Sequence, residues 1–415
     1  MSSLAIIGTG IAGMSCGYFL HKKYDITVFE QAGYAGGHTN TISVDENGSP
    51  VFFDTGFMVF NHITYPLLTQ LFRELDVATK PTSMSFSVQH TESGLEYCGS
   101  GLNGLFAQRK NIFNAGFIKM LMQISRFNSE SVKLLDSKEI SSLSIAEFCS
   151  RLNMGEDFLQ KYLIPMSGAV WSTPPDKMLH FPAHTLVRFF HNHGFLGPHT
   201  QHQWYTVTGG SRMYRDKIIA PYQDRLRLND AVVAVTRLDN GKAEVRTQSG
   251  HTQTFDKVIL ACHADQALRM LQNPTAEEQR LLGCFRYQPN RAIVHTDENV
   301  MPRARRAWSS WNYRIGKNLV PSTIYWMNSL QGVSEKRNYF VSINGAEAID
   351  PGKIITEIDY EHPLFDVAAQ QAQQELPQLN GKDSIYYCGS YFRYGFHEDA
   401  LLSAKNLCDG HFLNS

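Results

Sequence analysis

Leu4-Ala5-Ile6-Ile7 runs directly into Gly8-Thr9-Gly10-Ile11-Ala12-Gly13, and this stretch decides the fold. An apolar run without polar alternation predicts a strand that is buried on both faces. The glycines match G-x-G-x-x-G, in which the first makes a tight turn, the second lets a pyrophosphate approach the backbone, and the third lets the next helix pack close to the sheet. Residues 14–20 continue as that helix, whose N-terminus offers free N–H groups to phosphate. The stretch therefore predicts a dinucleotide site.

An acidic residue follows at the spacing that such a site uses. Residues 25–29 are typical of a second strand, and Glu30 comes directly after it. A carboxylate at this point binds the ribose hydroxyl pair and repels a 2′-phosphate, which argues against NADP. The alternative interpretation is a glycine-rich turn that binds no ligand.

Gly36-Gly37-His38-Thr39 distinguishes NAD from FAD. Together with Glu30, this run resembles the second FAD fingerprint of the flavin amine oxidase superfamily, to which amine oxidases, carotenoid desaturases and protoporphyrinogen oxidase belong. The glycine pair would give the backbone a second close approach to the cofactor phosphates. The superfamily usually has Arg where this chain has His38, so the charge of that contact would depend on pH. A plain polar loop residue is the alternative role for His38.

Later segments resemble the remaining parts of the superfamily's FAD site. Asp54-Thr55-Gly56 resembles the segment that runs beneath the flavin ring, and the strand at Val232 resembles the one whose backbone holds the adenine. The region after residue 385 resembles the third FAD motif, a strand, a glycine turn and a helix whose N-terminus stabilises negative charge on the reduced flavin; capping alone is the alternative role for its acidic residues. The resemblance implies non-covalent FAD, with contacts from Gly8, Gly10, Ile11, Ala12, Gly13, Glu30, Gly36, Gly37, His38, Thr39, Gly56, Phe57, Met58, Val232, Gly389, Ser390, Glu398, Asp399 and Ala400.

Composition limits the class of protein. The 415 residues exceed one ordinary domain, and 43% hydrophobic against 19% charged residues allows a large core. A net charge of −1 argues against nucleic acid as a partner. The seven cysteines are odd in number and form no C-x-x-C, which predicts free thiols in the cytoplasm. The first strand begins so early that no signal peptide is expected. No apolar run is long enough to predict a transmembrane helix.

We expect a mixed α/β, two-domain flavoprotein of the amine oxidase type. Its Rossmann-type FAD-binding domain would comprise residues 1–77, 205–283 and 356–415. An interleaved substrate domain, with an antiparallel sheet and helices, would comprise 78–204 and 284–355. Residues 102–127 mix large apolar groups with four cations and predict an amphipathic helix, either buried or in contact with the inner face of the membrane. Residues 322–328 predict one strand of the substrate sheet.

A histidine-rich segment lies between residues 180 and 202. It contains His180, His184, His191, His193, His199 and His202. No cysteine or carboxylate lies among them to complete a metal site, so we predict no metal.

The function follows from the resemblance. Residues 309–313, 325–328 and 389–399 resemble a bacterial subgroup described as predicted NAD/FAD-binding or FAD-dependent amine oxidoreductase proteins, whose relatives occur beside cyclopropane-fatty-acid-synthase-like methyltransferases. This context implies hydride transfer between the flavin and a C–H or C=C unit of an apolar substrate, a lipid acyl chain. A small-amine oxidase and a flavin-containing accessory subunit of a lipid methyltransferase are the alternatives. The candidate catalytic residues are Trp311, Tyr313, Trp326, Tyr394 and His397, with His193 as a further acid–base candidate.

Overall fold

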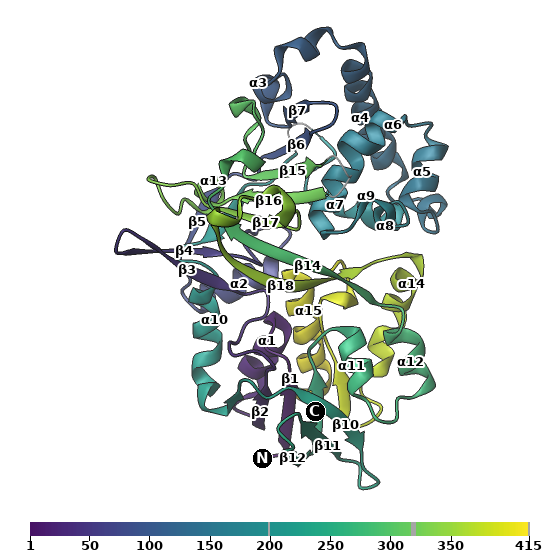
Figure 1. The fold of residues 1–415 in the computed structure, drawn as a ribbon. Helices are drawn as coiled ribbons and strands as arrows, with labels where there is room; N and C mark the ends of the chain where they lie inside the picture. Colours follow the sequence, from purple (N-terminus) through teal and green to yellow (C-terminus); the bar gives the residue numbers. More distant parts are fainter. Residues whose placement is uncertain (198–199, 317–320, 414–415) are drawn as a thin grey trace.

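A parallel sheet of five strands forms around the glycine-rich N-terminal stretch. The computed structural model describes residues 1–197, 200–316 and 321–413. The strand order is β19-β13-β1-β2-β9, and every neighbouring pair is parallel. The strands are β1 (Ser3–Ile7), β2 (Asp25–Phe29), β9 (Leu226–Arg227), β13 (Lys257–Leu260) and β19 (Ile385–Tyr387). One sheet thus unites the beginning, the middle and the end of the chain (Figure 1).

Both faces of this sheet are buried, as the apolar N-terminal run predicts. Leu4 and Ile6 pack into one hydrophobic cluster, whereas Ala5 and Ile7 pack into another. Helices α1 (Ile11–Leu20), α2 (Pro66–Glu74), α10 (Arg212–Ile219) and α15 (His397–Cys408) accompany the first cluster. The second cluster includes α11 (Ala264–Met270), α12 (Ala276–Leu282), α14 (Val367–Glu375) and a small antiparallel sheet of β10 (Val232–Arg237), β11 (Ala243–Thr247) and β12 (Thr252–Phe255).

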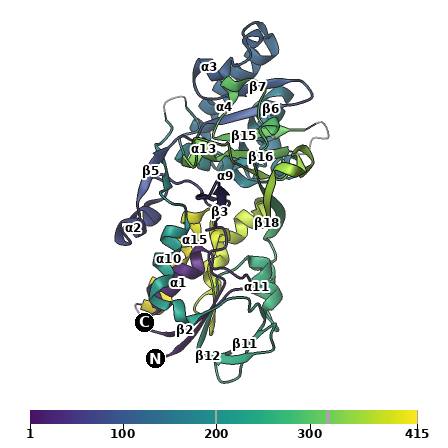
Figure 2. The same cartoon turned by 60° about the vertical axis from the view of Figure 1, so that its left-hand side comes forward.

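A second, seven-stranded sheet lies beyond the first one (Figures 1 and 2). Its order is β18-β14-β17-β16-β15-β6-β7, and the β15–β6 pair alone is parallel among these described strands. The strands are β6 (Phe86–His90), β7 (Leu95–Cys98), β14 (Arg286–His295), β15 (Trp311–Ile315), β16 (Pro321–Trp326), β17 (Phe340–Ile343) and β18 (Ile354–Leu364). Strand β18 runs across the predicted division at residues 355 and 356, and the domain division itself stays a prediction.

Helices cover the far part of the second sheet. They are α3 (Gly101–Leu105), α4 (Ala115–Leu134), α5 (Ile145–Arg151), α6 (Glu156–Phe158), α7 (Ile164–Trp171), α8 (Pro175–Met178) and α9 (Ala183–Asn192). Among the described residues, no helix is long and apolar enough to cross a membrane.

The predicted single helix over residues 102–127 is wrong. The chain forms α3, a 3₁₀ turn over Arg109–Phe113, and then α4. The side chain of Asn114 accepts a hydrogen bond from the backbone N–H of Phe117 (3.2 Å) and so starts a new helix. The predicted strand over 322–328 also ends early, because Met327–Gln331 forms helix α13.

Shorter elements join the two sheets. Strands β3 (Thr41–Glu46) and β4 (Ser49–Asp54) form a hairpin whose two-residue turn, Asn47-Gly48, has positive φ at both positions. Strand β5 (Thr79–Thr82) pairs with β8 (Trp204–Val207). The segment that leaves the part of the molecule with the parallel sheet therefore lies beside the segment that returns to it.

Candidate active site

The first glycine motif lies at the carboxyl end of β1. Gly8 has φ of +98°, and a Cβ there would lie 2.8 Å from the carbonyl oxygen of Ala261 on the adjacent strand segment. A Cβ on Gly13 would lie 1.9 Å from the carbonyl oxygen of Gly8, so helix and loop are in contact. A Cβ on Gly10 would meet nothing within 4 Å. The loop is therefore closed at Gly8 and Gly13 and open at Gly10, beside the N-terminal residues Ile11 and Ala12 of α1.

The second glycine motif faces that open position. Gly36 and Gly37 have φ of +129° and +58°, and a Cβ on Gly37 would lie 3.4 Å from the Cα of Gly10. The N–H of Gly36 donates to Oγ1 of Thr9 (3.1 Å). The two backbones thus meet where a pyrophosphate would need close approach to both.

Glu30 lies directly beside the first motif. Its carboxylate accepts hydrogen bonds from the N–H and hydroxyl of Thr9 (3.0 and 2.5 Å) and from the N–H of Ala32 (2.9 Å). Each carboxylate oxygen has more than one lone pair, so these contacts leave acceptor capacity for ribose hydroxyls. The N–H of Asp230 donates to the backbone oxygen of Glu30 (3.1 Å), which brings the start of β10, with Val232, to the same end of the sheet.

His38 is buried against strand β18. Its ring stacks on Tyr360 with centroids 4.6 Å apart and lies 5.1 Å from the ring of His362. Burial lowers the pKa of His38 well below its usual value, and the neighbouring histidines lower it further. Its Nε2 atom has no hydrogen-bond partner within the described part of the chain. The open position at Gly10 and this unpartnered nitrogen both fit a cofactor that brings phosphate and hydroxyl groups.

The third motif begins at the carboxyl end of β19. A Cβ on Gly389 would lie 3.5 Å from the backbone oxygen of Cys262, which follows β13, and Ser390 starts the next turn. Helix α15 then begins at His397, whose Nε2 lies 2.7 Å from the hydroxyl of Tyr214 and 3.4 Å from Oγ1 of Thr39. The second motif, the third motif and helix α10 thus meet in one buried polar cluster.

The acidic residues of α15 have partners within the protein. Glu398 accepts from the N–H groups of Leu67 and Leu68 (2.8 and 3.0 Å), and Asp399 accepts from the N–H of Phe396 (3.0 Å). Burial raises the pKa of Asp399 to about 7. Both side chains therefore fix helix starts. The backbone of the first turn, including Ala400, is left as the part of this helix that would serve a cofactor.

The segment around Gly56 packs tightly on the second motif. A Cβ on Gly56 would lie 2.3 Å from the carbonyl oxygen of His38, and the N–H of Phe57 donates to that oxygen (2.8 Å). The Phe57 ring stacks on His397 with centroids 3.9 Å apart. The backbone oxygen of Met58 accepts from the hydroxyl of Thr206 (2.8 Å), which ties the segment to β8.

The amine oxidase alternative would need an aromatic cage from Trp311, Tyr313 and Trp326, and these three side chains do not lie together. Trp311 and Tyr313 alternate with Asn312 on β15 and share one buried cluster. Trp326 belongs to a different cluster, and its indole N–H donates to Asn338 (2.8 Å). The reason is strand alternation: Tyr325 pairs with Trp311, so its neighbour Trp326 points to the opposite face.

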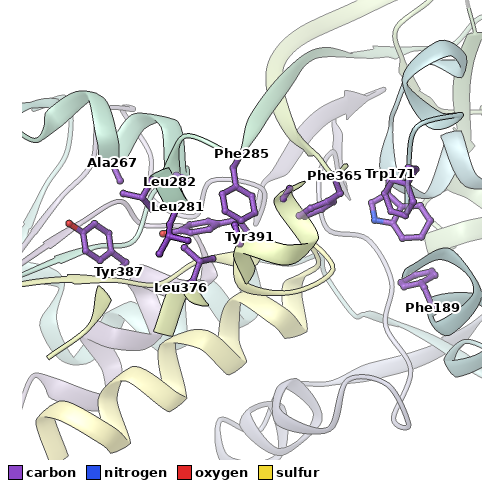
Figure 3. Close-up of a cluster of buried hydrophobic side chains, with 14 of the residues drawn as sticks. Trp171, Phe189, Ala267, Leu281, Leu282, Phe285, Phe365, Leu376, Tyr387 and Tyr391 are labelled. Carbon is purple, nitrogen blue, oxygen red and sulfur yellow. The ribbon is translucent and has the colours of Figure 1, made fainter. Parts of the chain in front are cut away.

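A cluster of aromatic rings joins helices α7 and α9 to the third FAD motif. We call Trp171, Phe189 and Phe396 the aromatic cluster; their centroids are 4.7 to 5.9 Å apart. Trp171 and Phe189 come from α7 and α9 and lie side by side (Figure 3). The indole N–H of Trp171 donates to the backbone oxygen of Tyr394 (3.1 Å), and His193 stacks on Phe189 at 3.8 Å.

The two histidines of this region are held neutral. Burial lowers the pKa of His193 to about 4 and that of His397 to about 3. Neither is therefore a strong base at neutral pH, which weakens the acid–base role predicted for them.

The histidine-rich segment is dispersed in the structure. His193 is buried, His184 and His202 are half-buried, and His180 and His191 are exposed; His199 lies outside the described residues. Within residues 1–197, 200–316 and 321–413, no three His, Cys, Asp or Glu side chains are grouped to hold a metal ion.

The sequence did not reveal several residues of this site. Tyr214 and the β18 pair Tyr360 and His362 were not predicted, because their partners His397 and His38 lie far away in the chain. One signal in the sequence could have indicated an inward-facing histidine on β18. Ile358, Tyr360 and His362 alternate with Asp359 and Glu361, so the first three share one face of the strand. Asp359 is exposed and Glu361 is half-buried.

Comparison with known proteins decides the family. The model of the flavin containing amine oxidoreductases matches residues 11–336. The chain belongs to the flavin containing amine oxidoreductase family. The predicted FAD cofactor and oxidoreductase class are thereby confirmed, and the individual contacts stay predictions. The association with a methyltransferase also stays a prediction.

Individual relatives are distant. Coproporphyrinogen III oxidase of Staphylococcus aureus (strain NCTC 8325 / PS 47) is 24% identical over 188 residues, which span 42% of this chain and only 38% of that protein. The fatty acid isomerase of P. acnes that produces CLA has a similar structure, with a TM-score of 0.71, 15% identity and 99% of both chains covered. Cyclohexylamine oxidase from Brevibacterium oxydans IH-35A gives 0.69, 13% identity, and 99% of this chain and 98% of that one. These structural likenesses confirm the predicted fold class.

Proposed function

We propose that this flavin-dependent oxidoreductase acts on an apolar substrate, a long acyl chain, and moves a hydride between a C–H or C=C unit of that chain and FAD. The observation that carries the proposal is the aromatic cluster, because it brings uncharged rings from α7 and α9 against the third FAD motif. Aromatic and aliphatic surfaces bind methylene chains by the hydrophobic effect.

The charges near the aromatic cluster also favour an uncharged substrate. His193 and His397 are neutral at physiological pH, since burial lowers the pKa of both. The carboxylates of Glu398 and Asp399 are already engaged by backbone N–H groups. An ammonium group placed here would lose its hydration and would have to share carboxylates that already accept backbone N–H groups.

The chain's own residues position the substrate and exclude water. FAD supplies, when bound, a two-electron acceptor and donor. Forming a C=C bond removes a hydride from one carbon and a proton from its neighbour, and the reverse reaction adds both. The packed rings of Trp171, Phe189 and Phe396 would restrict the acyl chain to a few orientations, which favours reaction at one position along it.

Two similar structures carry names that bear on the choice of substrate. The fatty acid isomerase named above acts on a fatty acid, which supports an acyl substrate for this chain. Cyclohexylamine oxidase points to the amine alternative. That alternative relied on a cage of three aromatic side chains, and Trp326 lies on the other face of the sheet from Trp311 and Tyr313.

A chain-length series tests the proposal. Saturated fatty acids of increasing length are titrated into the purified holoenzyme, and binding is followed through the flavin absorbance. Burial of each methylene contributes about 0.8 kcal/mol, so the Kd should fall about fourfold for each added methylene until the binding site is filled. A Kd that does not change with chain length would contradict an apolar acyl site.

A further inference from the structure

We propose that the end of the molecule around α3 docks on an anionic phospholipid bilayer. The docking tip consists of the apolar residues Leu102, Ile112 and Phe113 and the cations Arg109, Lys110 and Arg306. Leu102 is 76% exposed, Phe113 is 91% exposed and Ile112 is 46% exposed. Large apolar side chains that cluster with cations at one surface are typical of interfacial membrane contacts.

The structure places this tip differently from the sequence prediction. In α4, the large apolar residues Phe117, Met120 and Phe127 are buried and Met122 is exposed, so the main apolar face of this helix packs inward. The exposed apolar residues Leu102 and Phe113 instead belong to α3 and the 3₁₀ turn. Figures 1 and 2 both show α3 at the far end of the molecule from β12, where it is accessible to a flat surface.

The chain segment that forms α3 and the 3₁₀ turn carries cations and no carboxylate, which suits an anionic surface. No acidic residue occurs between Glu96 and Glu130, whereas Arg109 and Lys110 lie within that stretch. Glu96 is buried, and its carboxylate accepts from the N–H groups of Arg303 and Ala304 (2.9 and 2.8 Å).

The cations themselves are available. Among the described residues, Arg109, Lys110 and Arg306 form no ion pair with a carboxylate. Their positive charges are therefore not neutralised by a carboxylate and attract lipid phosphates, and this electrostatic attraction is screened by salt.

A cavity beside the docking tip suits a phosphate headgroup. It has a volume of about 580 Å³, and its polar lining includes Ser83, Ser85, Ser100, Asn103, Arg109 and Arg306. The guanidinium of Arg109 donates to the backbone oxygen of Phe106 (2.9 Å) and to Oδ1 of Asn103 (3.0 Å), which holds it at the cavity. Hydroxyl and guanidinium donors together match the oxygens of a phosphodiester.

The experiment is vesicle sedimentation of the full-length holoenzyme. Phosphatidylcholine vesicles are compared with vesicles that also contain phosphatidylglycerol, at low and high salt. We expect binding to the anionic vesicles that weakens as salt rises. Leu102→Asp with Phe113→Asp, and separately Arg109→Gln with Arg306→Gln, should each weaken that binding at least tenfold.

Matched controls lie in the other half of the molecule. Val233 is 41% exposed on β10, and Arg246 is exposed on β11, so Val233→Asp and Arg246→Gln make the same kinds of substitution, apolar to Asp and Arg to Gln, away from the docking tip. They should bind like the wild type, and an unchanged flavin spectrum shows that each variant is folded.

Two results would overturn the proposal. One is equal binding of the wild type and both docking-tip variants to anionic vesicles. The other is a wild-type dimer in solution that Leu102→Asp with Phe113→Asp makes monomeric, since a second copy of the chain would then cover this surface. Neither measurement requires turnover, so the docking tip is tested independently of the proposed function.

Discussion

The Nε2 atom of His397 lies 2.7 Å from the hydroxyl oxygen of Tyr214, and this contact joins the start of α15 to α10. The Tyr214 hydroxyl also lies 3.2 Å from Oγ1 of Thr39, which follows the second glycine pair. Burial keeps His397 uncharged, with a pKa of about 3. One buried cluster therefore fixes helix α10 against two segments, those of Thr39 and His397, that the family resemblance assigns to FAD.

Replacing Tyr214 with Phe should weaken flavin retention. The change removes the hydroxyl that His397 and Thr39 share, and it leaves buried polar atoms with poorer partners, at a cost of roughly 1–3 kcal/mol. Tyr222→Phe is the matched control, because it removes a buried hydroxyl that donates to the backbone oxygen of Met14 in α1 and takes no part in the contact between Tyr214 and His397. Denaturant titration should show comparable destabilisation of both variants, whereas flavin release should increase only in Tyr214→Phe. Equal flavin release from the two variants would show that the cluster does not position the cofactor.

Gly10→Val should produce a folded protein without flavin. A side chain at Gly10 enters open space, so the fold tolerates it, but that space is where the pyrophosphate is predicted to lie. Gly13→Val is the contrast, since its Cβ would lie 1.9 Å from the Gly8 carbonyl oxygen and the fold itself should suffer. Circular dichroism and flavin absorbance separate the two effects. A Gly10→Val protein that remains yellow would retain its flavin, and this would show that the pyrophosphate does not lie beside Gly10.

The protein should lose stability on acidification through its buried histidines. Burial lowers the pKa of His295 to about 4, below the value of about 6.5 in an unfolded chain. The unfolded state therefore binds the proton first, so the stabilisation is complete above about pH 6.5 and is lost as the pH falls toward 4. Between about pH 7 and about pH 5 this one residue should account for roughly 2 kcal/mol of the free energy of unfolding.

His295→Gln tests this assignment. Gln does not titrate and can still reach Ser342, whose hydroxyl lies 2.8 Å from Nε2 of His295. The free energy of unfolding, measured with denaturant at both pH values, should then fall less steeply with acidification than in the wild type. Identical slopes would show that His295 is not held neutral by the fold.

Local sequence patterns predicted much of the fold. The unbroken apolar run of β1 requires burial on both faces, and its residues do alternate between two hydrophobic clusters. The turn, the helix and the second strand that follow also form as their residues predict. These features depend on neighbours in the chain.

Long-range pairing could not be predicted in the same way. The parallel pairing of β15 with β6 places Trp311 beside Phe86. The pairing of β15 with β16 places Trp311 opposite Tyr325, so that the next residue, Trp326, lies on the opposite face of the sheet. The composition of residues 102–127 likewise suited a single helix, but it gave no indication that the Asn114 side chain would cap a new one. Contacts of this kind depend on the packing of the whole molecule.

Phe189→Ala should weaken the binding of an acyl chain more than it weakens the retention of FAD. Phe189 lies between His193 and Phe396, at 3.8 and 4.7 Å, so its loss opens the aromatic cluster. Removing a buried Phe costs roughly 3–5 kcal/mol in stability wherever it lies. Phe148→Ala, in α5 and fully buried, is therefore the control for stability. Titration with a long-chain fatty acid should show a Kd at least tenfold higher for Phe189→Ala and unchanged for Phe148→Ala. The reverse pattern would show that the substrate does not bind at the aromatic cluster.

The most direct test of the proposed function is the flavin absorbance of the holoenzyme, recorded without oxygen, after mixing with a long-chain acyl lipid or with a small primary amine such as cyclohexylamine. An apolar site predicts that the acyl lipid bleaches or shifts the flavin spectrum and that the amine leaves it unchanged. Rapid bleaching by the amine, with no response to acyl lipids, would contradict the proposal and establish an amine oxidase.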